Sequence, residues 1–335
     1  MKHFSAFIFL FIPLQILAQK SDFKDIDFKK ADKIAKVFKG NNLHNLPLLT
    51  HNLTDKLETD VEKFRAIYLW ISTNIKGNYA MYRKVSRKRK KFKNDSISLL
   101  NWNNEYTKKV FKDLLKNKRT MCTGYAYLLK TMTNIANIEC KIVDGYGRNI
   151  SANIGELSAP NHSWNAVKLN NKWYLADATW SSGYTDLNTN TFIFDYNDGY
   201  FLTEPKLFIK NHYPLHKKWT LIPQETSAET FIHAPLVYGK VFKFGFIPIS
   251  PIKMDNEIAI NKEVVFAYQL LKPLDANKIQ LMITNGTNGK LLKPKIELKN
   301  EVLNIKHQFD KKGFFDIHLL YNGKTLVTYT FNVKK

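Results

Sequence analysis

Three residues of the sequence have the types and the spacing of a nucleophile, a base and an orienting acid: Cys122, His162 and Asp177. A cysteine thiolate can attack a carbonyl carbon, a histidine can accept the thiol proton, and a carboxylate can fix the tautomer of the histidine. Each residue alone has a structural explanation, as a small buried hydrophobe, a core histidine or a capping aspartate. Together they predict acyl-transfer chemistry, provided that the fold brings them into contact.

Cys122 stands at the start of a segment with helical periodicity. Apolar residues recur at spacings of three and four from Met121 to Ala136, as on one face of an α-helix. We expect Thr120 to be the N-cap, which places Cys122 in the first helical turn. Unpaired backbone N–H groups and the helix dipole stabilise an anion there, so this position favours a thiolate with a lowered pKa.

His162 and Asp177 lie on two apolar runs that flank Asn170-Asn171. Asparagine tolerates positive φ, so the pattern predicts a β-hairpin with a two-residue turn. Counting outward from this turn places Trp164 opposite Asp177. Because His162 is two residues from Trp164 on the same face, His162 and Asp177 become diagonal neighbours within reach of a hydrogen bond. An odd loop length would instead place them on opposite faces.

Further elements are expected around these motifs. Thr59 and Glu62 have the spacing of a capping box and precede a helical stripe that begins at Val61. Periodicity also predicts helices over residues 23–38 and 110–116 and a buried strand over 140–146, whereas residues 43–53, 94–108 and 148–160 read as loops or polar connections.

The first residues resemble an export signal. A charged start at Lys2 is followed by an apolar run from Phe4 to Leu17 and by the small residue Ala18. This order is typical of a secretory signal peptide, and the run is too short and too interrupted to span a bilayer comfortably. We expect cleavage after Ala18 and a secreted or periplasmic mature protein without a transmembrane segment. An uncleaved N-terminal anchor is the alternative.

The net charge of +22 is unusual, although the apolar fraction of 44% and the charged fraction of 24% are those of ordinary globular proteins. Eight of the positive charges lie between Arg83 and Lys93, in a run without acidic residues. We expect a solvated, mobile loop that could attract an anionic polymer of the cell envelope. Phe92 is the sole aromatic residue of the run, which argues against a nucleic-acid partner.

Cys122 and Cys140 are the two cysteines of the sequence, too few for a disulfide framework or a tetrahedral zinc site. Cys140 lies at the start of the predicted strand, so we expect a free, buried thiol there. The sequence has no calcium-loop pattern, and thiol chemistry of the kind described above needs no metal. We therefore expect neither a metal nor a cofactor.

The pattern changes beyond about residue 255 to short alternating strands, with a strong hairpin signal at Asn322-Gly323. Such strands predict a small all-β sandwich of the immunoglobulin-like type. The length of the chain suits two domains. We expect a signal peptide over residues 1–18, a catalytic domain over 19–225, a connecting segment over 226–254 and a β-sandwich over 255–335.

Three segments of the sequence resemble the motifs of the transglutaminase-like superfamily. They are Cys-Thr-Gly-Tyr-Ala at residues 122–126, His-Ser-Trp-Asn at 162–165 and Trp-Tyr-Leu-Ala-Asp-Ala-Thr-Trp at 173–180. The order Cys, His, Asp and the intervals of 40 and 15 residues also fit that superfamily. The sequence looks more like its bacterial transglutaminase-like and kyphoscoliosis-peptidase-like branch than like the animal crosslinking enzymes. The resemblance covers about residues 55–185, with weaker similarity to about residue 250.

This resemblance implies an α+β fold with a papain-like core, in which N-terminal helices pack on an antiparallel sheet. It implies that Cys122 is the nucleophile, His162 the base and Asp177 the orienting residue. The implied reaction is acyl transfer from a protein or peptide amide through a thioester, and crosslinking, deamidation and peptide hydrolysis share that chemistry. The backbone N–H of Cys122 is the natural first oxyanion donor.

One feature departs from the family pattern. The superfamily usually has a glycine and a small apolar residue before the cysteine, where this sequence has Thr120-Met121. The departure leaves an alternative open, namely a catalytically inactive scaffold or binding module of the cell envelope.

Overall fold

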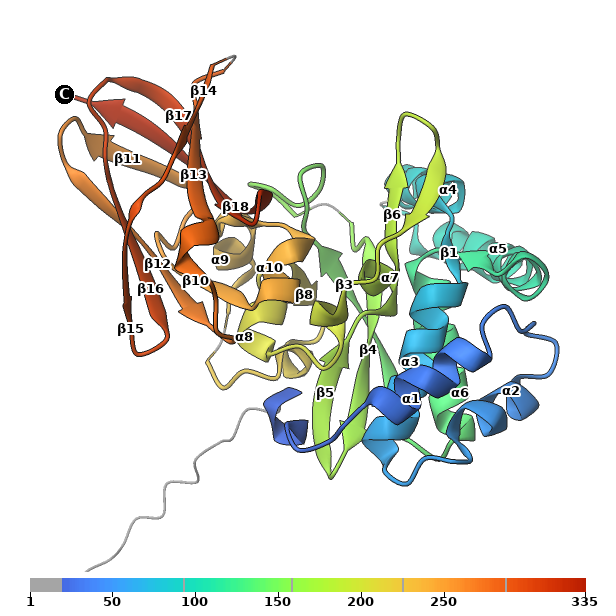
Figure 1. Ribbon diagram of the computed structural model, residues 1–335. Coiled ribbons are helices and arrows are strands. Elements are labelled where there is room, and N and C mark those ends of the chain that lie inside the picture. The colour runs from blue at the N-terminus through green and yellow to red at the C-terminus, as the bar shows by residue number, and fades with distance from the viewer. Residues whose placement is uncertain (1–19, 93, 158, 225, 287) are drawn as a thin grey trace, which may run out of the picture.

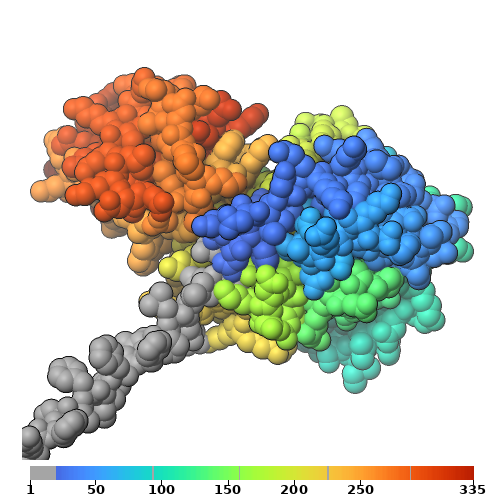
Figure 2. All heavy atoms as spheres, turned by 60° about the horizontal axis from the view of Figure 1, so that its bottom comes forward, coloured from blue at the N-terminus to red at the C-terminus, as the bar shows by residue number. Residues whose placement is uncertain are grey.

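The computed structural model describes residues 20–92, 94–157, 159–224, 226–286 and 288–335. The expected signal peptide at residues 1–18 lies outside the described residues. Helices and a small central sheet make up the first part of the chain, and a β-sandwich makes up the last part (Figure 1). Figure 2 shows the sandwich as a lobe beside the N-terminal helices.

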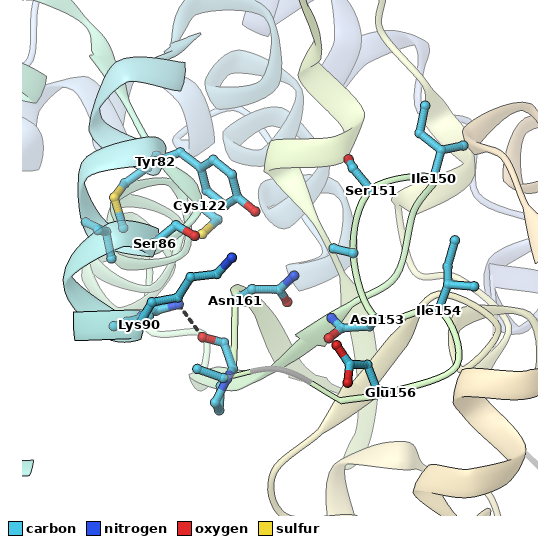
Figure 3. A pocket seen from close by; sticks show the side chains of 16 residues that line it. Tyr82, Ser86, Lys90, Cys122, Ile150, Ser151, Asn153, Ile154, Glu156 and Asn161 are labelled. Carbon is cyan, nitrogen blue, oxygen red and sulfur yellow. Dashed lines mark hydrogen bonds between the residues drawn. The ribbon is translucent and has the colours of Figure 1, made fainter. Parts of the chain in front are cut away.

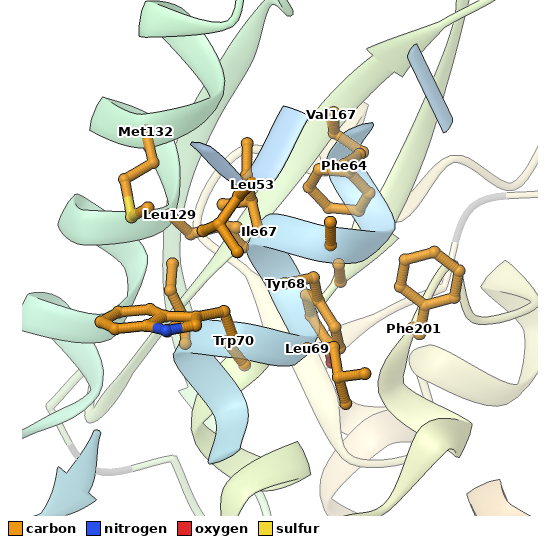
Figure 4. Close-up of a cluster of buried hydrophobic side chains, with 14 of the residues drawn as sticks. Leu53, Phe64, Ile67, Tyr68, Leu69, Trp70, Leu129, Met132, Val167 and Phe201 are labelled. Atoms are coloured by element: carbon orange, nitrogen blue, oxygen red, sulfur yellow. The ribbon is translucent and has the colours of Figure 1, made fainter. Parts of the chain in front are cut away.

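The long helix α3 (Asp60–Asn74) is the centre of the N-terminal part. It begins at the predicted capping box, in which the Glu62 N–H donates to Thr59 Oγ1 and the Thr59 N–H donates to the Glu62 carboxylate. The buried side chains of α3 meet those of the neighbouring helices and of the sheet (Figure 4). The other helical segments are η1 (Lys20–Phe23), α1 (Lys29–Val37), α2 (Leu46–Thr54), α4 (Tyr79–Lys91), α5 (Ser96–Asn117) and α6 (Cys122–Ile135).

Several helix boundaries differ from the prediction. Residues 43–53 are not a loop, because they include most of α2, which begins where the Asn45 side chain accepts from the Leu48 N–H. The helix expected over residues 23–38 is shorter and starts at Lys29. The polar segment 94–108 and the short helix expected at 110–116 belong to one helix, α5.

Residues 83–91 of the basic run belong to the helix α4, so the prediction of a mobile loop is wrong for them. Asn78 caps α4 by accepting from the Met81 N–H. Met81 and Val85 are buried against α5 and Met121, which stabilises one face of the helix. Four of the basic residues lie in the last turn, where cations interact favourably with the helix dipole.

The central sheet has the strand order β5-β4-β3-β8, and its paired strands are antiparallel. The predicted hairpin joins β4 to β5: Leu169 pairs with Lys172, and the turn residues Asn170 and Asn171 have φ of 47° and 61°. Positive φ at both positions is the conformation that favours asparagine and glycine. The strands are β3 (Cys140–Gly147), β4 (His162–Leu169), β5 (Lys172–Ala176) and β8 (His212–Pro214).

Both faces of the central strand β4 are buried. On β4, Val167 and Leu169 join the core under α3 and α6, whereas Trp164 and Ala166 face a second core that continues into the sandwich. A strand buried on both faces has a strongly specified register, because a slip by one residue would exchange its two sets of side chains. The sheet is therefore a rigid support for the residues at its edge.

Short elements complete the first part and connect it to the sandwich. The strands β1 and β2 form a parallel pair, and β6 and β7 form an antiparallel pair. These elements are β1 (Lys76–Gly77), β2 (Arg119–Thr120), β6 (Gly183–Asp186), β7 (Thr191–Phe194), α7 (Ala178–Ser182), η2 (Asp198–Tyr200), α8 (Pro205–Phe208), η3 (Lys217–Thr220), α9 (Ala228–His233) and α10 (Gly239–Phe244).

The C-terminal part consists of two sheets, β10-β12-β16-β15 and β11-β18-β17-β13-β14. Phe266 of the first sheet packs on Tyr329 and Phe331 of the second, so the sheets share one core. The elements are β9 (Leu236–Val237), β10 (Phe246–Ser250), β11 (Asp255–Ala259), β12 (Glu263–Leu270), η4 (Ala276–Lys278), β13 (Ile279–Thr284), β14 (Gly289–Leu292), β15 (Lys295–Lys299), β16 (Val302–Gln308), β17 (Gly313–Tyr321) and β18 (Lys324–Lys334).

The predicted fold class is confirmed: helices packed on an antiparallel sheet precede a small β-sandwich of the immunoglobulin-like type. The segment expected to connect the two parts contributes strands as well, since β9 pairs with β18 and β10 pairs with β12. The predicted domain limits at residues 225 and 255 stay a prediction. Within the described residues, no helix combines the length and the apolar character needed to cross a membrane.

Candidate active site

Cys122 is the first residue of α6, so its predicted place in the first helical turn is confirmed. The predicted N-cap is wrong, because Met121 occupies that position and no side chain caps the helix. Thr120 instead ends β2 with its side chain fully buried. It packs so tightly against Gly124 that a Cβ on Gly124 would lie 2.0 Å from Thr120 Oγ1. Glycine at position 124 thus permits this close approach.

The segment that leads into Cys122 is held against the start of α4. Gly77 pairs with Thr120 in the β1–β2 ladder, and the Asn78 N–H donates to the Thr120 carbonyl at 2.7 Å. The Met121 side chain packs in the cluster that includes Val85 of α4. The two residues that depart from the family pattern therefore fix the position of α4 beside the cysteine.

His162 and Asp177 meet as the hairpin register predicts. His162 Nε2 lies 2.7 Å from Asp177 Oδ2, and both side chains are buried, with 6% and 1% of their residues' surface exposed. His162 begins β4, and Asp177 directly follows β5 as the N-cap of α7. The Trp180 ring stacks on the imidazole at a centroid distance of 4.6 Å, and this contact restricts the rotation of the imidazole ring.

The Asp177 carboxylate accepts four hydrogen bonds. Oδ1 accepts from the backbone N–H groups of Thr179 and Trp180 at 2.8 and 3.2 Å. Oδ2 contacts His162 and also Nε2 of a second histidine, His212 of β8, at 3.0 Å. His212 has no exposed surface and stacks on Phe208. A carboxylate held from four directions has one fixed orientation.

These contacts fix the proton positions on both histidines. An ionised carboxylate can only accept hydrogen bonds, so Nε2 of His162 and Nε2 of His212 must both carry protons. The Nδ1 atom of neutral His162 is then the basic nitrogen. This tautomer leaves His162 able to accept the thiol proton of Cys122 while the carboxylate holds the opposite side of the ring.

The pKa shifts agree with this arrangement. Burial raises the pKa of the Cys122 thiol, but hydrogen bonding to His162 and the charges of His162 and Arg89 lower it, and the net shift is below the ordinary 9.0. Burial lowers the pKa of His162, but the charge of Asp177 and hydrogen bonds to Asp177 and Cys122 raise it to about 10. The site therefore favours a thiolate beside an imidazolium.

The shifts of the remaining partners follow from the same charges. Burial raises the pKa of Asp177, yet the charge of His162 and hydrogen bonds from both histidines hold it well below its usual range. Burial lowers the pKa of His212 to about 4 in spite of the neighbouring carboxylate. At neutral pH, Asp177 is thus ionised and His212 is neutral.

The second cysteine provides an internal contrast. Cys140 is a free, buried thiol, as predicted. Burial raises its pKa to about 11, above the ordinary 9.0, because the nearby hydrogen bonds and lysine charges only partly oppose desolvation. The environments of the two thiols thus shift their pKa values in opposite directions.

His162, Asp177 and His212 also form a group whose potential ligand atoms all lie within 4.8 Å of one another. The separations of 2.7 and 3.0 Å from the carboxylate oxygen are hydrogen-bond distances. Ligands bound to zinc at about 2.0–2.1 Å in a tetrahedral site would lie roughly 3.3 Å apart. The observed geometry thus fits a hydrogen-bonded carboxylate better than a ligand set.

A cavity of about 370 Å³ opens in front of Cys122. One wall is α4, from which Tyr82, Ser86 and Lys90 project, and the other is the segment that contains Ser151, Asn153 and Glu156 (Figure 3). Residues 148–157 and 159–161 of this second wall are called the cleft loop below. Cys122 lines this cavity, and 5% of its surface is exposed.

The sequence interpretation missed two parts of the site. His212 gave no local signal, because it reaches Asp177 only through the pairing of β8 with β3, in which Gly147 lies opposite His212. The α4 wall was missed because the run of eight basic residues from Arg83 to Lys93, seven of which lie in α4, was interpreted as a loop. An argument from helical spacing could have found it, since Tyr82, Ser86 and Arg89 fall on one helix face.

The comparisons with known proteins agree with these motifs. A protein-family model with the description "Transglutaminase-like superfamily" matches residues 48–178. The Homo sapiens kyphoscoliosis peptidase is 34% identical over 207 residues, which cover 61% of this chain and 28% of that protein. Hillarin of Drosophila melanogaster is 23% identical over 234 residues, which cover 66% of this chain and 26% of Hillarin. The chain spans about a quarter of the length of these relatives.

Among solved structures, the Lin-41 filamin domain aligns with 23% of this chain and 82% of that chain, at 12% identity and a TM-score of 0.20. That likeness is too low to support an argument. The family match includes the segments around Cys122, His162 and Asp177. The match over residues 48–178 confirms the predicted resemblance of this part of the chain to the transglutaminase-like superfamily.

Proposed function

We propose that the protein is a thiol-dependent acyl-transfer enzyme that acts on protein or peptide amides, with Cys122 as nucleophile, His162 as base and Asp177 as orienting residue. The observation that supports this most directly is the 2.7 Å contact between His162 Nε2 and Asp177 Oδ2. It fixes the tautomer in which Nδ1 serves the thiol, and the thiol stands at a helix start with a lowered pKa. The match to the superfamily supports a peptidase or an acyltransferase more broadly.

In the first step the Cys122 thiolate attacks the amide carbonyl carbon and forms a C–S bond. The C–N bond then breaks, and the His162 imidazolium gives its proton to the departing nitrogen, which leaves as ammonia or an amine. The product on the protein is a thioester. The backbone N–H of Cys122 is the first candidate donor to the oxyanion that forms on the carbonyl oxygen.

In the second step neutral His162 removes a proton from water or from an acceptor amine, which attacks the thioester carbonyl. The C–S bond breaks, and the Cys122 thiolate and the His162 imidazolium are restored. Water gives hydrolysis or deamidation, whereas an amine gives transfer or crosslinking. Asp177 stays ionised throughout and stabilises the imidazolium.

A catalytically inactive scaffold or binding module is the second candidate. The burial of the thiol favours it, because only 5% of the surface of Cys122 is exposed. The two candidates differ in the reactivity of the thiol, since a scaffold needs no activated thiolate.

Alkylation with iodoacetamide at pH 7 tests the proposal. We expect Cys122 to react at least about ten-fold faster than Cys140, because the two pKa values shift in opposite directions. A Cys140→Ala variant assigns the fast reaction to Cys122, and Cys122→Ala should abolish it. Equal rates for both thiols would contradict the proposed activation and favour the scaffold.

A substrate assay separates the possible reactions. The protein is incubated with an unstructured protein such as casein and a fluorescent primary amine. Incorporation of the amine indicates transfer, new amino termini indicate peptide hydrolysis, and release of ammonia without either indicates deamidation. Cys122→Ala is the control, and an activity that survives this substitution would contradict the proposed nucleophile.

We also propose that the protein is exported, as the apolar run from Phe4 to Leu17 suggests. Expression of the full chain in a bacterium, followed by fractionation and amino-terminal sequencing, tests this. We expect a periplasmic or secreted product that begins at Gln19. A product confined to the cytoplasm with an intact start would contradict it.

A further inference from the structure

The wall of the active-site cavity formed by α4 carries a strong positive charge. The helix contains seven basic residues and no acidic one: Arg83, Lys84, Arg87, Lys88, Arg89, Lys90 and Lys91. None of them forms an ion pair with a carboxylate of the described residues. Their positive charge is therefore uncompensated where a substrate approaches the thiol.

The basic residues of this helix differ in what they face. Lys84 and Lys88 lie over the rings of Tyr106 and Trp102 of α5. Arg89 and Lys90 line the cavity, and Arg89 Nη1 donates to the Pro160 carbonyl of the cleft loop. Arg87 is exposed and does not line the cavity. The cavity therefore receives two specific cations from α4.

The opposite wall does not neutralise them. Glu156 is the acidic residue among those that line the cavity, and it belongs to the cleft loop across from α4 (Figure 3). No ion pair between Glu156 and Arg89 or Lys90 occurs in the part of the chain that the structure describes. The cavity is thus cationic on the helix side and carries its one lining carboxylate on the loop side.

We propose that this site selects peptide segments with a glutamate or aspartate next to the reactive residue, and that Lys90 and Arg89 bind that carboxylate. The inference rests on the proposed function for the identity of the site. It adds the substrate class: acidic, extended segments of proteins. The carboxylate lies against α4 while the reactive amide reaches Cys122. An apolar or basic neighbour in the substrate would leave the two cations without a carboxylate partner.

Binding of fluorescent peptides to the full chain with Cys122→Ala tests the inference without requiring catalytic turnover. Two peptides of equal length are compared, one with glutamates flanking a central glutamine and one with glutamines in their place. We expect the acidic peptide to bind at least about five-fold more tightly at low salt. Raising the salt from about 0.05 to about 0.5 M should reduce this preference, because screening weakens exposed charge pairs.

Lys90→Gln locates the effect, and Arg87→Gln is its matched control. Each substitution removes one positive charge from the same helix, but Arg87 does not line the cavity. We expect Lys90→Gln to reduce the preference for the acidic peptide roughly three- to five-fold and Arg87→Gln to leave it nearly unchanged. Lys90 is the better test than Arg89, because the charge of Arg89 also acts on the Cys122 thiol.

Three outcomes would overturn the inference. Equal binding of both peptides excludes a charge preference. Equal losses in Lys90→Gln and Arg87→Gln indicate diffuse attraction along the helix, as expected for an anionic polymer. A preference for the acidic peptide that persists unchanged at about 0.5 M salt would mean that charge pairing is not its cause. The binding assay needs no turnover. If Cys122 proved unreactive, the proposed function would fail, but the comparison of the two peptides would still test the charge preference by itself.

Discussion

At the scale of single residues, Asp177 determines how the site works. Its carboxylate holds His162 by one oxygen and caps α7 by the other, so the same side chain orients the proposed base and begins a helix. Only 1% of the surface of Asp177 is exposed, whereas a residue that merely caps a helix has no need to be buried. The cost of burying this charge is offset by four hydrogen bonds and by the neighbouring imidazolium.

The thiolate–imidazolium pair predicts a bell-shaped dependence of kcat/KM on pH. The acid limb should lie below the ordinary thiol value of 9.0, because His162 lowers the pKa of Cys122. The alkaline limb should lie near 10, because Asp177 raises the pKa of His162 to about that value and the reaction needs its proton. Rates measured from pH 4 to about 11 with one peptide substrate give both limbs.

Asp177→Asn should move the alkaline limb to lower pH, since loss of the negative charge lowers the pKa of His162. We expect kcat to fall by roughly two to four orders of magnitude, because an amide in place of the carboxylate no longer holds the correct tautomer. Asp186→Asn, at the end of β6 and away from the cavity, is the control. An unchanged alkaline limb in Asp177→Asn would show that another group sets it.

His212 is a positioning residue behind the carboxylate, because it contacts Asp177 and does not line the cavity. His212→Phe keeps the ring against Phe208 and removes the donor. We expect kcat to fall about ten-fold with little change in KM, as for loss of one hydrogen bond to a charged group. His212→Gln should restore part of the rate. A folded His212→Phe variant with unchanged kcat would assign His212 a purely structural role.

At the scale of secondary-structure elements, the β4–β5 hairpin brings two of the three proposed catalytic side chains together. Its two-residue turn fixes the register, and the register places His162 and Asp177 on one face. The α4–α5 pair contributes the other half of the site, because it packs on Met121 and forms a wall of the cavity.

The turn can be tested at Asn171, which has φ of 61°. A β-branched residue is strained at positive φ, so Asn171→Val should lower the free energy of unfolding by about 1–2 kcal/mol. Asn171→Gly should be neutral within a few tenths of a kcal/mol, because glycine adopts this conformation freely. Urea denaturation measures both. Equal stabilities of the two variants would mean that the turn residue does not control the hairpin.

Elements with strong local signals were predictable from the sequence. The capping box at Thr59, the Asn170-Asn171 turn and the start of α6 each depend on residues within a few positions of one another. These local signals were sufficient to place His162 next to Asp177, because hairpin register depends on a simple count.

The missed features depend on contacts between distant segments. The helix α4 is stabilised by burial of Met81 and Val85 against α5 and Met121, which its charge pattern does not reveal. His212 contacts a carboxylate 35 residues away in sequence, through a short strand that pairs with β3. Thr120 was expected to cap α6, but its position is fixed by the ladder with β1. Local propensity cannot supply information of this kind.

At the scale of the whole molecule, the site is connected to the C-terminal part. The core on the far side of the sheet contains Trp164 of β4 together with residues of the sandwich. The cleft loop is connected too: buried Arg148 donates to the carbonyls of Asn153, Ala234 and Pro235 at 3.2, 2.6 and 2.9 Å. Residues 234–235 immediately precede β9, which pairs with β18 of the sandwich.

Arg148→Met should loosen this connection. The substitution leaves three buried carbonyl groups without their donor, so we expect the free energy of unfolding to fall by at least about 2 kcal/mol. Hydrogen exchange should accelerate in residues 149–157 and 232–237, and kcat/KM should fall. Arg83→Met, at an exposed position, is the control. Exchange that accelerates equally along the whole chain would mean global destabilisation instead of a local connection.

The Arg148 hydrogen bonds have a further consequence, because thermodynamic linkage is reciprocal. If a peptide binds better when the cleft loop is ordered, its occupancy must in turn order the residues that hold the loop, including Ala234 and Pro235. The same free energy appears in both directions. In that case, a molecule that strains or stabilises the β9–β18 edge of the sandwich would lower or raise the affinity of the distant cavity without touching Cys122.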